Sequence, residues 1–178
     1  EHFSLPASDV DIWMGTLSKT FCGCGGYIAG SSVLIDLLQY QAPGFVYSVG
    51  MPPMLAEVSS RAIDLMLEEP WRVQELHANS QTLLRLAKEA GLDTGKADGY
   101  AVIPIMVGDS ISAVLLADML RKAGILVLPI IYPGVEEGRA RLRFFVSQKH
   151  TKDQLEEAVE KTAHFLPLAR EKAQGFVE

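Results

Sequence analysis

The sequence predicts an α/β protein built from two parts. A short apolar run, Val10–Met14, is typical of a buried strand and leads into a glycine-rich turn. Two long amphipathic segments, 55–68 and 71–90, predict helices. After Gly91 the pattern changes to strand, helix, strand, strand, helix, which predicts a small α/β sandwich. We place the boundary at residues 75/76, inside a helix, so no flexible linker separates the parts.

Between the first strand and the long helices, the sequence predicts one helix and one loop. Ser31 or Ser32 can cap a helix that runs to about Gln39, because a serine hydroxyl accepts a hydrogen bond from the first free N–H groups of a helix. Residues 41–53 predict a loop, since Pro43-Gly44 favours a turn.

The second part is expected to contain three strands and two helices after the long helix. Thr151 and Gln154 form a capping-box pattern, in which each side chain bonds the backbone N–H of the other residue. The expected elements are a strand over 100–107, a helix that Asp109 or Ser110 opens and that ends at Gly124, strands over 125–131 and 141–147, and a helix from 151 to about 166.

Composition and charge exclude several classes of protein. The chain has 178 residues, 48% of them apolar, which is typical of a globular protein. Its net charge is −6 and its 16 Lys and Arg residues are dispersed, so no nucleic-acid surface is expected. No apolar run is long enough to span a bilayer and the first residues do not form a signal-peptide pattern, so we expect no membrane partner.

Cys22 and Cys24 are the two cysteines of the chain. A disulfide between residues this close requires strained geometry. Two cysteines without further Cys or His ligands are poor evidence for a metal. We therefore expect no metal site, and we interpret both thiols as small buried groups of a protein in the reducing cytoplasm.

A hydroxyl and an amine three residues apart, Thr16 and Lys19, follow the first strand. A lysine that loses part of its hydration has a lowered pKa, and its amine can then form a Schiff base. Thr16 could hydrogen-bond an anionic group beside it. The same pair is more often part of a solvated loop, so this pattern alone leaves both interpretations open.

Three ordered segments carry a more specific signal. They are the pattern Gly-Thr-x-x-Lys-x-Phe at 15–21, an aromatic residue and a serine before Pro-Pro at 47–53, and Tyr132-Pro133 followed by alternating arginines at 138–143, Ser147 and His150-Thr151. In this order they resemble the α-oxoamine synthases, pyridoxal-phosphate enzymes of the aspartate-aminotransferase-like (fold type I) superfamily. The resemblance covers about residues 1–159.

The resemblance implies that the chain is the C-terminal part of a fold type I pyridoxal-phosphate-dependent transferase. Residues 1–75 would be the end of the cofactor-binding large domain, and residues 76–178 the small C-terminal α/β domain. The family's acidic partner of the pyridine nitrogen and its stacking ring would lie upstream. We therefore expect the chain alone to be an incomplete, inactive portion of a larger enzyme.

The resemblance also implies roles for individual residues toward pyridoxal 5'-phosphate. Lys19 would form the Schiff base with the cofactor and then act as a general base or acid. Thr16 would donate to the phosphate, and Ser18 is a weaker candidate. Ser48 matches a serine that the neighbouring subunit of a homodimer contributes to the phosphate site, although Val49 stands where threonine is usual.

Arg143 matches the arginine that binds the α-carboxylate of the amino acid, for which the forked guanidinium is suited. Arg141 is the alternative, because a two-residue shift would exchange them, and Arg139 is expected to be solvated. The three alternate along a strand and so share one face. Gly134 and Glu136 depart from the family's proline-containing segment and leave the acyl partner open.

The implied activity is the decarboxylative condensation of an α-amino acid with an acyl thioester to an α-aminoketone. Glycine, alanine or serine could be the amino donor, and coenzyme A or an acyl-carrier protein could carry the acyl group. A pyridoxal-phosphate aminotransferase or amino-acid acetyltransferase-lyase remains open as an alternative. A non-catalytic fragment or interaction domain is the alternative from another class.

Overall fold

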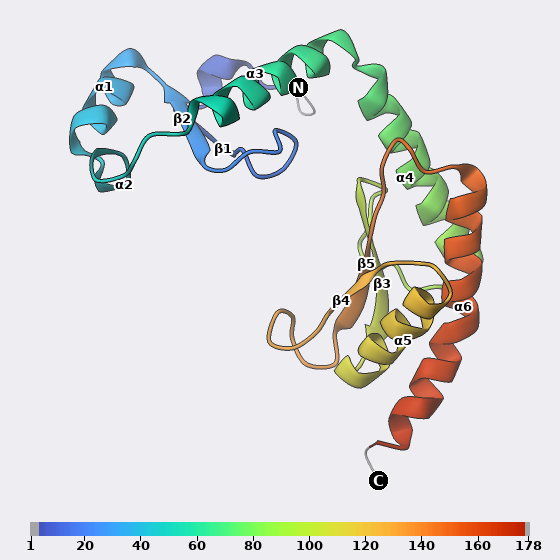
Figure 1. Ribbon diagram of the computed structural model, residues 1–178. Helices are drawn as coiled ribbons and strands as arrows, with labels where there is room; N and C mark the ends of the chain where they lie inside the picture. The colour runs from blue at the N-terminus through green and yellow to red at the C-terminus, as the bar shows by residue number, and fades with distance from the viewer. Residues whose placement is uncertain (1–3, 177–178) are drawn as a thin grey trace. The chain divides into compact units, whose positions relative to one another are not determined.

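The computed structural model describes residues 4–176, and the chain divides into two compact units, residues 1–70 and 71–178. The first unit contains a 3-10 turn (Ala7–Asp9), strands β1 (Ile12–Thr16) and β2 (Gly26–Gly30), and helices α1 (Ser32–Gln41), α2 (Pro43–Val46) and α3 (Pro53–Glu68). The second contains α4 (Trp71–Glu89), β3 (Val102–Gly108), α5 (Ser110–Lys122), β4 (Leu128–Ile130), β5 (Ala140–Phe145) and α6 (Lys152–Gln174) (Figure 1). The predicted domain boundary at 75/76 stays a prediction.

Strands β1 and β2 form an antiparallel hairpin in which Thr16 lies opposite Gly26. The sequence predicted only a glycine-rich turn after β1 and missed β2. Glycine is required in β2 because a Cβ at position 26 would lie 2.7 Å from the carbonyl oxygen of Gly15. The missing side chain therefore allows the two backbones to approach each other at the end of the hairpin.

The prediction of a buried first strand is wrong for this structure, because β1 is exposed. Met14 is 77% exposed, and Ile12 and Trp13 also lie on the surface. Among the residues that the structure describes, β1 pairs with β2 alone, so its second edge has no partner. Because these apolar residues alternate, they occupy both faces of the strand, which is typical of the interior of a larger sheet.

The predicted helix after the hairpin is confirmed as α1, with Ser31 as its N-cap. The Ser31 hydroxyl oxygen accepts a hydrogen bond from the Leu34 N–H at 3.3 Å. The predicted loop over 41–53 is partly wrong, because α2 forms one helical turn that starts at Pro43. A proline fits the first position of a helix, where its missing N–H would have no partner.

The second unit contains a three-stranded antiparallel sheet in the order β3-β5-β4. In the central strand β5, Arg143 lies between Pro104 of β3 and Leu128 of β4. Ala140 and Leu142 of β5 are buried against α5, in one core cluster with residues of α6. The largest fully buried apolar side chains of this core are Ile103, Leu116, Leu120 and Leu142. The strand predicted over 125–131 is shorter than expected, since only β4 pairs.

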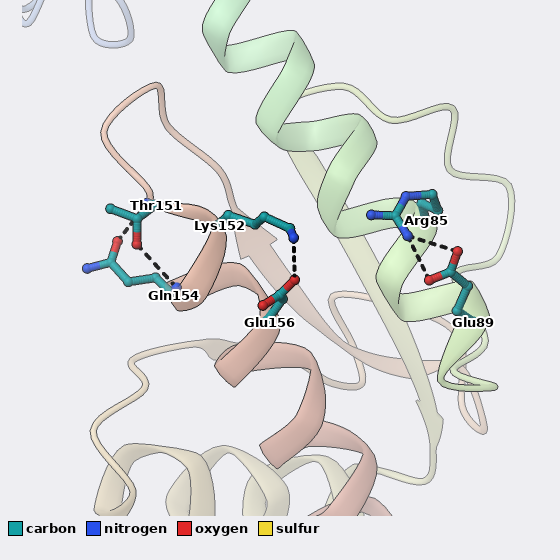
Figure 2. Close-up of polar contacts among 6 residues, drawn as sticks. All are labelled: Arg85, Glu89, Thr151, Lys152, Gln154 and Glu156. Atoms are coloured by element: carbon teal, nitrogen blue, oxygen red, sulfur yellow. Dashed lines mark hydrogen bonds and ion pairs between the residues drawn. The ribbon is translucent and has the colours of Figure 1, made fainter.

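Helix α6 begins with the capping box that the sequence predicted (Figure 2). The Gln154 N–H donates to the Thr151 hydroxyl at 3.3 Å, and the Thr151 N–H donates to the Gln154 side-chain oxygen at 3.0 Å. The two bonds satisfy backbone donors that have no partner inside the helix. They fix the point at which the chain turns from β5 into α6.

The predicted end of this helix near residue 166 is wrong, because α6 continues through Pro167 to Gln174. Ala169 and Ala173 are buried, so the apolar face of the helix extends past the proline. Arg170 also donates from Nε and Nη2 to the Val107 carbonyl, at 3.2 and 2.9 Å. These contacts with β3 and the core outweigh the cost of a proline inside a helix.

Ion pairs on the helix surfaces include Arg85–Glu89 at 2.7 Å and Lys152–Glu156 at 3.1 Å (Figure 2). Both are exposed pairs four residues apart, and such pairs contribute about 0.3–0.5 kcal/mol. The buried core is therefore the main source of stability in the second unit. Within residues 4–176, no helix combines the length and the apolar character that crossing a membrane requires.

Asp109 is the N-cap of α5, and its Oδ1 accepts a hydrogen bond from the Ser112 N–H at 2.7 Å. Partial burial raises the pKa of the Asp109 carboxyl, but hydrogen bonds from Ser112 and from backbone N–H groups outweigh it and lower the pKa below the usual 3.8. Because the folded pKa is below the unfolded one, the charged cap stabilises the fold above the unfolded pKa. This contribution is lost as the pH falls through the folded pKa.

We expect Asp109→Ala to lower the free energy of unfolding by about 0.5–2 kcal/mol, as measured by urea denaturation at neutral pH. Asp109→Asn is the matched control, since it keeps the acceptor oxygen without the charge. Its stability should change less than that of the wild type between about pH 5 and pH 3. An identical pH dependence of the two proteins would contradict a stabilising charge at this cap.

Candidate functional site

Lys19 lies in the turn that joins β1 to β2. Leu17 closes this turn with both of its backbone groups: its N–H donates to the Gly25 carbonyl at 2.9 Å, and its carbonyl accepts from the Gly23 N–H at 2.7 Å. The Leu17 side chain is buried and anchors the turn to the first unit. The closed turn therefore holds the backbone of Lys19 at a fixed place beside the end of β1.

Two hydroxyl groups meet at the base of the same turn. The Oγ1 of Thr16 and the Oγ of Ser18 are 2.8 Å apart, and the Ser18 N–H donates to Thr16 Oγ1 at 3.2 Å. Thr16 Oγ1 also lies 3.3 Å from the Gly25 carbonyl, to which it donates. Both side chains are exposed, so the hydroxyls can exchange these mutual bonds for bonds to a ligand. The structure thus places Ser18 beside Thr16.

The amine of Lys19 is exposed. Among the described residues, no carboxylate or carbonyl pairs with it, so no partner there competes with a ligand for its nitrogen. The donor set fits pyridoxal phosphate: an amine for its carbonyl carbon and two hydroxyls, on Thr16 and Ser18, for its phosphate oxygens. These three residues are the part of the predicted cofactor site that the structure brings together.

Both cysteines lie in the same turn, and the prediction that they are buried is wrong. Cys22 and Cys24 are exposed free thiols. Cys22 has a φ of 51°, in the left-handed region that residues other than glycine seldom adopt. The turn reverses direction within a few residues and buries Leu17 alone at its base, so no apolar interior is left for the thiols.

Ser48 follows α2 and is exposed, and its hydroxyl donates to the Val49 carbonyl at 3.0 Å. Among the residues that the structure describes, Ser48 makes no hydrogen bond to Thr16 or Lys19. A role for Ser48 at the phosphate of a neighbouring subunit, as the resemblance implies, stays a prediction.

A pocket of about 710 Å³ lies between the hairpin and α1. Its wall includes Thr16 at the end of β1, together with the apolar side chains of Met14, Ile28, Leu38 and Phe45. Thr16 thus borders a largely apolar hollow. Lys19 is not part of this wall.

The predicted carboxylate site lies on the central strand of the second unit. Arg141 and Arg143 alternate with buried Leu142, as predicted, and Arg143 is exposed. The Arg143 guanidinium carbon lies 5.2 Å from the centre of the Phe145 ring. Arg141 instead donates from Nε to the Arg139 carbonyl at 3.1 Å. The sequence analysis missed Phe145, although its position two residues after Arg143 places both on one face.

Lys19 and Arg143 lie in different units of the chain. The lysine turn belongs to the first unit, and the arginine strand belongs to the second. The roles of Lys19, Thr16, Ser48, Arg141 and Arg143 toward a cofactor or substrate remain predictions.

Comparison with known proteins gives consistent matches. The model of the family "Aminotransferase class I and II" matches residues 2–161. The 8-amino-7-oxononanoate synthase of Symbiobacterium thermophilum is 38% identical over 170 residues, which are 96% of this chain and 42% of that protein. The chain therefore spans about two fifths of the length of this relative.

Solved structures give the same picture of the fold. A serine palmitoyltransferase with pyridoxal phosphate matches with a TM-score of 0.83 at 18% identity, over 90% of this chain and 40% of that one. The 8-amino-7-oxononanoate synthase of Francisella tularensis matches with a TM-score of 0.78 at 22% identity, over 88% of this chain and 46% of that one. The predicted fold class, the C-terminal part of a fold type I transferase, is confirmed.

The hairpin that carries the lysine turn should not tolerate a side chain at position 26. We expect Gly26→Ala to destabilise the protein by about 1–3 kcal/mol, because the new Cβ would overlap the Gly15 carbonyl and push the strands apart. Gly44→Ala is the matched control, since a Cβ there meets no atom within 4 Å. Thermal unfolding followed by tryptophan fluorescence, from Trp13 and Trp71, measures both. Equal stability of the two variants would show that the strands are not this close.

Proposed function

This chain belongs to the aminotransferase class I and II family and, within it, to the α-oxoamine synthases, and we propose that its whole protein condenses an α-amino acid with an acyl thioester. Loss of the α-carboxylate as carbon dioxide would give an α-aminoketone. Pyridoxal phosphate is the cofactor of this family. The observation that carries the proposal is the turn in which Lys19, Thr16 and Ser18 present an amine and two adjacent hydroxyls.

Pyridoxal phosphate supplies the electron sink that makes the Cα of an amino acid acidic. Lys19 would hold the cofactor through its amine and would move a proton at Nζ. The closed turn supports this role because Leu17 fixes the backbone from which the lysine side chain starts. Thr16 and Ser18 would orient the phosphate by donating their hydroxyl protons to it in place of their present bonds, which run from Thr16 to the Gly25 carbonyl and between the two hydroxyls.

Arg143 binds the α-carboxylate of the substrate before that group is lost. Its guanidinium presents paired N–H donors, and its place on a central strand, held on both sides by β3 and β4, limits its movement. Arg141 is the alternative, but its Nε is engaged with the Arg139 carbonyl. This difference favours Arg143.

The same proposal includes an acyl carrier, which is coenzyme A or an acyl-carrier protein. It also includes a homodimer in which Ser48 reaches the neighbouring site, and a cytoplasmic location. The alternative, an aminotransferase, would share Lys19 and Arg143. Release of labelled carbon dioxide from a carboxyl-labelled amino acid distinguishes the two, because an aminotransferase retains the carboxylate.

The assignment of Lys19 can be tested by reduction of the complete holoenzyme with borohydride. We expect the reduced pyridoxyl group on the peptide that contains Lys19, because this amine is exposed and belongs to the same turn as the two hydroxyls. Lys19→Arg is the control and should give no adduct. Mass spectrometry locates the adduct, and its appearance on Lys88 or Lys96 would refute the assignment.

The two arginines can be separated by their effects on amino-acid binding. A charge-assisted bidentate pair is worth about 1.5–3 kcal/mol, so Arg143→Ala should raise the amino-acid dissociation constant by about one to two orders of magnitude. Arg143→Lys should recover only part of the loss, because it keeps the charge without the fork.

Arg141→Ala is the matched control on the same face of β5 and should bind the amino acid nearly as the wild type does. A spectral titration of each holoenzyme with the amino acid gives the constants. If Arg141→Ala weakens binding and Arg143→Ala does not, the roles of the two residues are reversed.

A further inference from the structure

We propose that Phe145 is the positioning residue of Arg143, and that its ring fixes the orientation in which the guanidinium meets the substrate carboxylate. The inference rests on the carboxylate-binding role of Arg143 in the proposed function. Its basis is the distance of 5.2 Å between the guanidinium carbon and the centre of the Phe145 ring. A guanidinium within about 6 Å of a ring centre is attracted by the negative face of the ring.

The backbone holds the two side chains together. Arg143 and Phe145 are two residues apart in β5 and therefore point to the same face. Phe145 pairs with Val102 of β3, and the next residue, Val146, donates its N–H to the Ala101 carbonyl at 2.8 Å. The strand is thus hydrogen-bonded up to and beyond the ring, so the ring has a defined place relative to Arg143.

The ring contact leaves binding capacity on the guanidinium. Its carbon lies over the ring, and the group carries five N–H donors, more than one ring contact can engage. Within the described residues, no carboxylate pairs with Arg143, so these donors remain available. Arg141 has a different arrangement, because its Nε is bonded to a backbone carbonyl. The ring therefore favours Arg143 over its neighbour as the carboxylate ligand.

Arg143 and Phe145 also border the same hollow, a pocket of about 540 Å³ in the second unit. Its wall includes the exposed side chains of Leu126 and Leu128, and Leu128 lies opposite Arg143 in β4. Leu128 therefore gives the ion an apolar neighbour on the wall of this hollow. The ring and the ion thus form one wall of a site that an α-amino acid can enter.

The test is a double-mutant cycle in the complete holoenzyme, with L-alanine as the probe and glycine and L-serine titrated in parallel. We expect Phe145→Leu to raise the amino-acid dissociation constant about two- to five-fold, which corresponds to about 0.5–1 kcal/mol for an exposed cation–π contact. Phe145→Tyr and Phe145→Trp keep an aromatic face and should restore binding. The dissociation constant of pyridoxal phosphate should not change in any of them.

The cycle separates positioning from a merely structural effect. In the Arg143→Ala background, Phe145→Leu should have no further effect on amino-acid binding, because the ring acts through the arginine. Phe165→Leu is the matched control: it makes the same change at a partly buried position that packs against the core outside this hollow, and it should lower thermal stability without changing amino-acid affinity.

An unchanged dissociation constant in Phe145→Leu, with Arg143→Ala still impaired, would overturn this inference and leave the proposed function standing. An equal loss from Phe145→Leu with and without Arg143 would also overturn it, since the ring would then act independently. If Arg143→Ala itself binds amino acids normally, both the carboxylate role and the positioning role are wrong. Because Phe145 is 60% exposed, the leucine variant is expected to fold.

Discussion

The double hydrogen bond of Leu17 to its own turn is the constraint on which the candidate cofactor site depends. The Leu17 N–H donates to the Gly25 carbonyl, and the Leu17 carbonyl accepts from the Gly23 N–H. β1 ends at Thr16. The Thr16 hydroxyl and the Lys19 amine, on either side of Leu17, therefore start from backbone positions that the closed turn holds in place. Without this closure, Lys19 would lie in an open loop, and its distance from the hydroxyls would change with each conformation.

Local signals in the sequence were sufficient for most of the helices. Ser31 caps α1, and the Thr151/Gln154 box opens α6, because capping depends on side-chain chemistry within a few residues. The end of α6 could not be predicted in the same way. Proline predicts a stop, but the burial of Ala169 and the bonds of Arg170 to β3 are contacts with distant parts of the chain.

The candidate site was predicted through a resemblance in sequence, and its physical details were not. The pairing of Thr16 with Ser18 depends on the tight turn after β1, whereas the sequence analysis gave Ser18 only as a weaker candidate. β2 was missed because glycines are unfavourable in strands, whereas here the close approach of Gly26 to Gly15 requires one. The exposure of Cys22 likewise follows from the shape of the turn.

The central position of β5 has a consequence for how such a site can diverge. A shift of one residue in its register would exchange Arg143 with buried Leu142, so both neighbouring strands oppose it. β4, by contrast, is a three-residue edge strand, and Leu128 projects beside the arginine from that edge. Descendants of this sequence can therefore change the size or polarity of the side chain next to the ion at little cost to folding. The charge of Arg143 stays in place while its apolar neighbour changes.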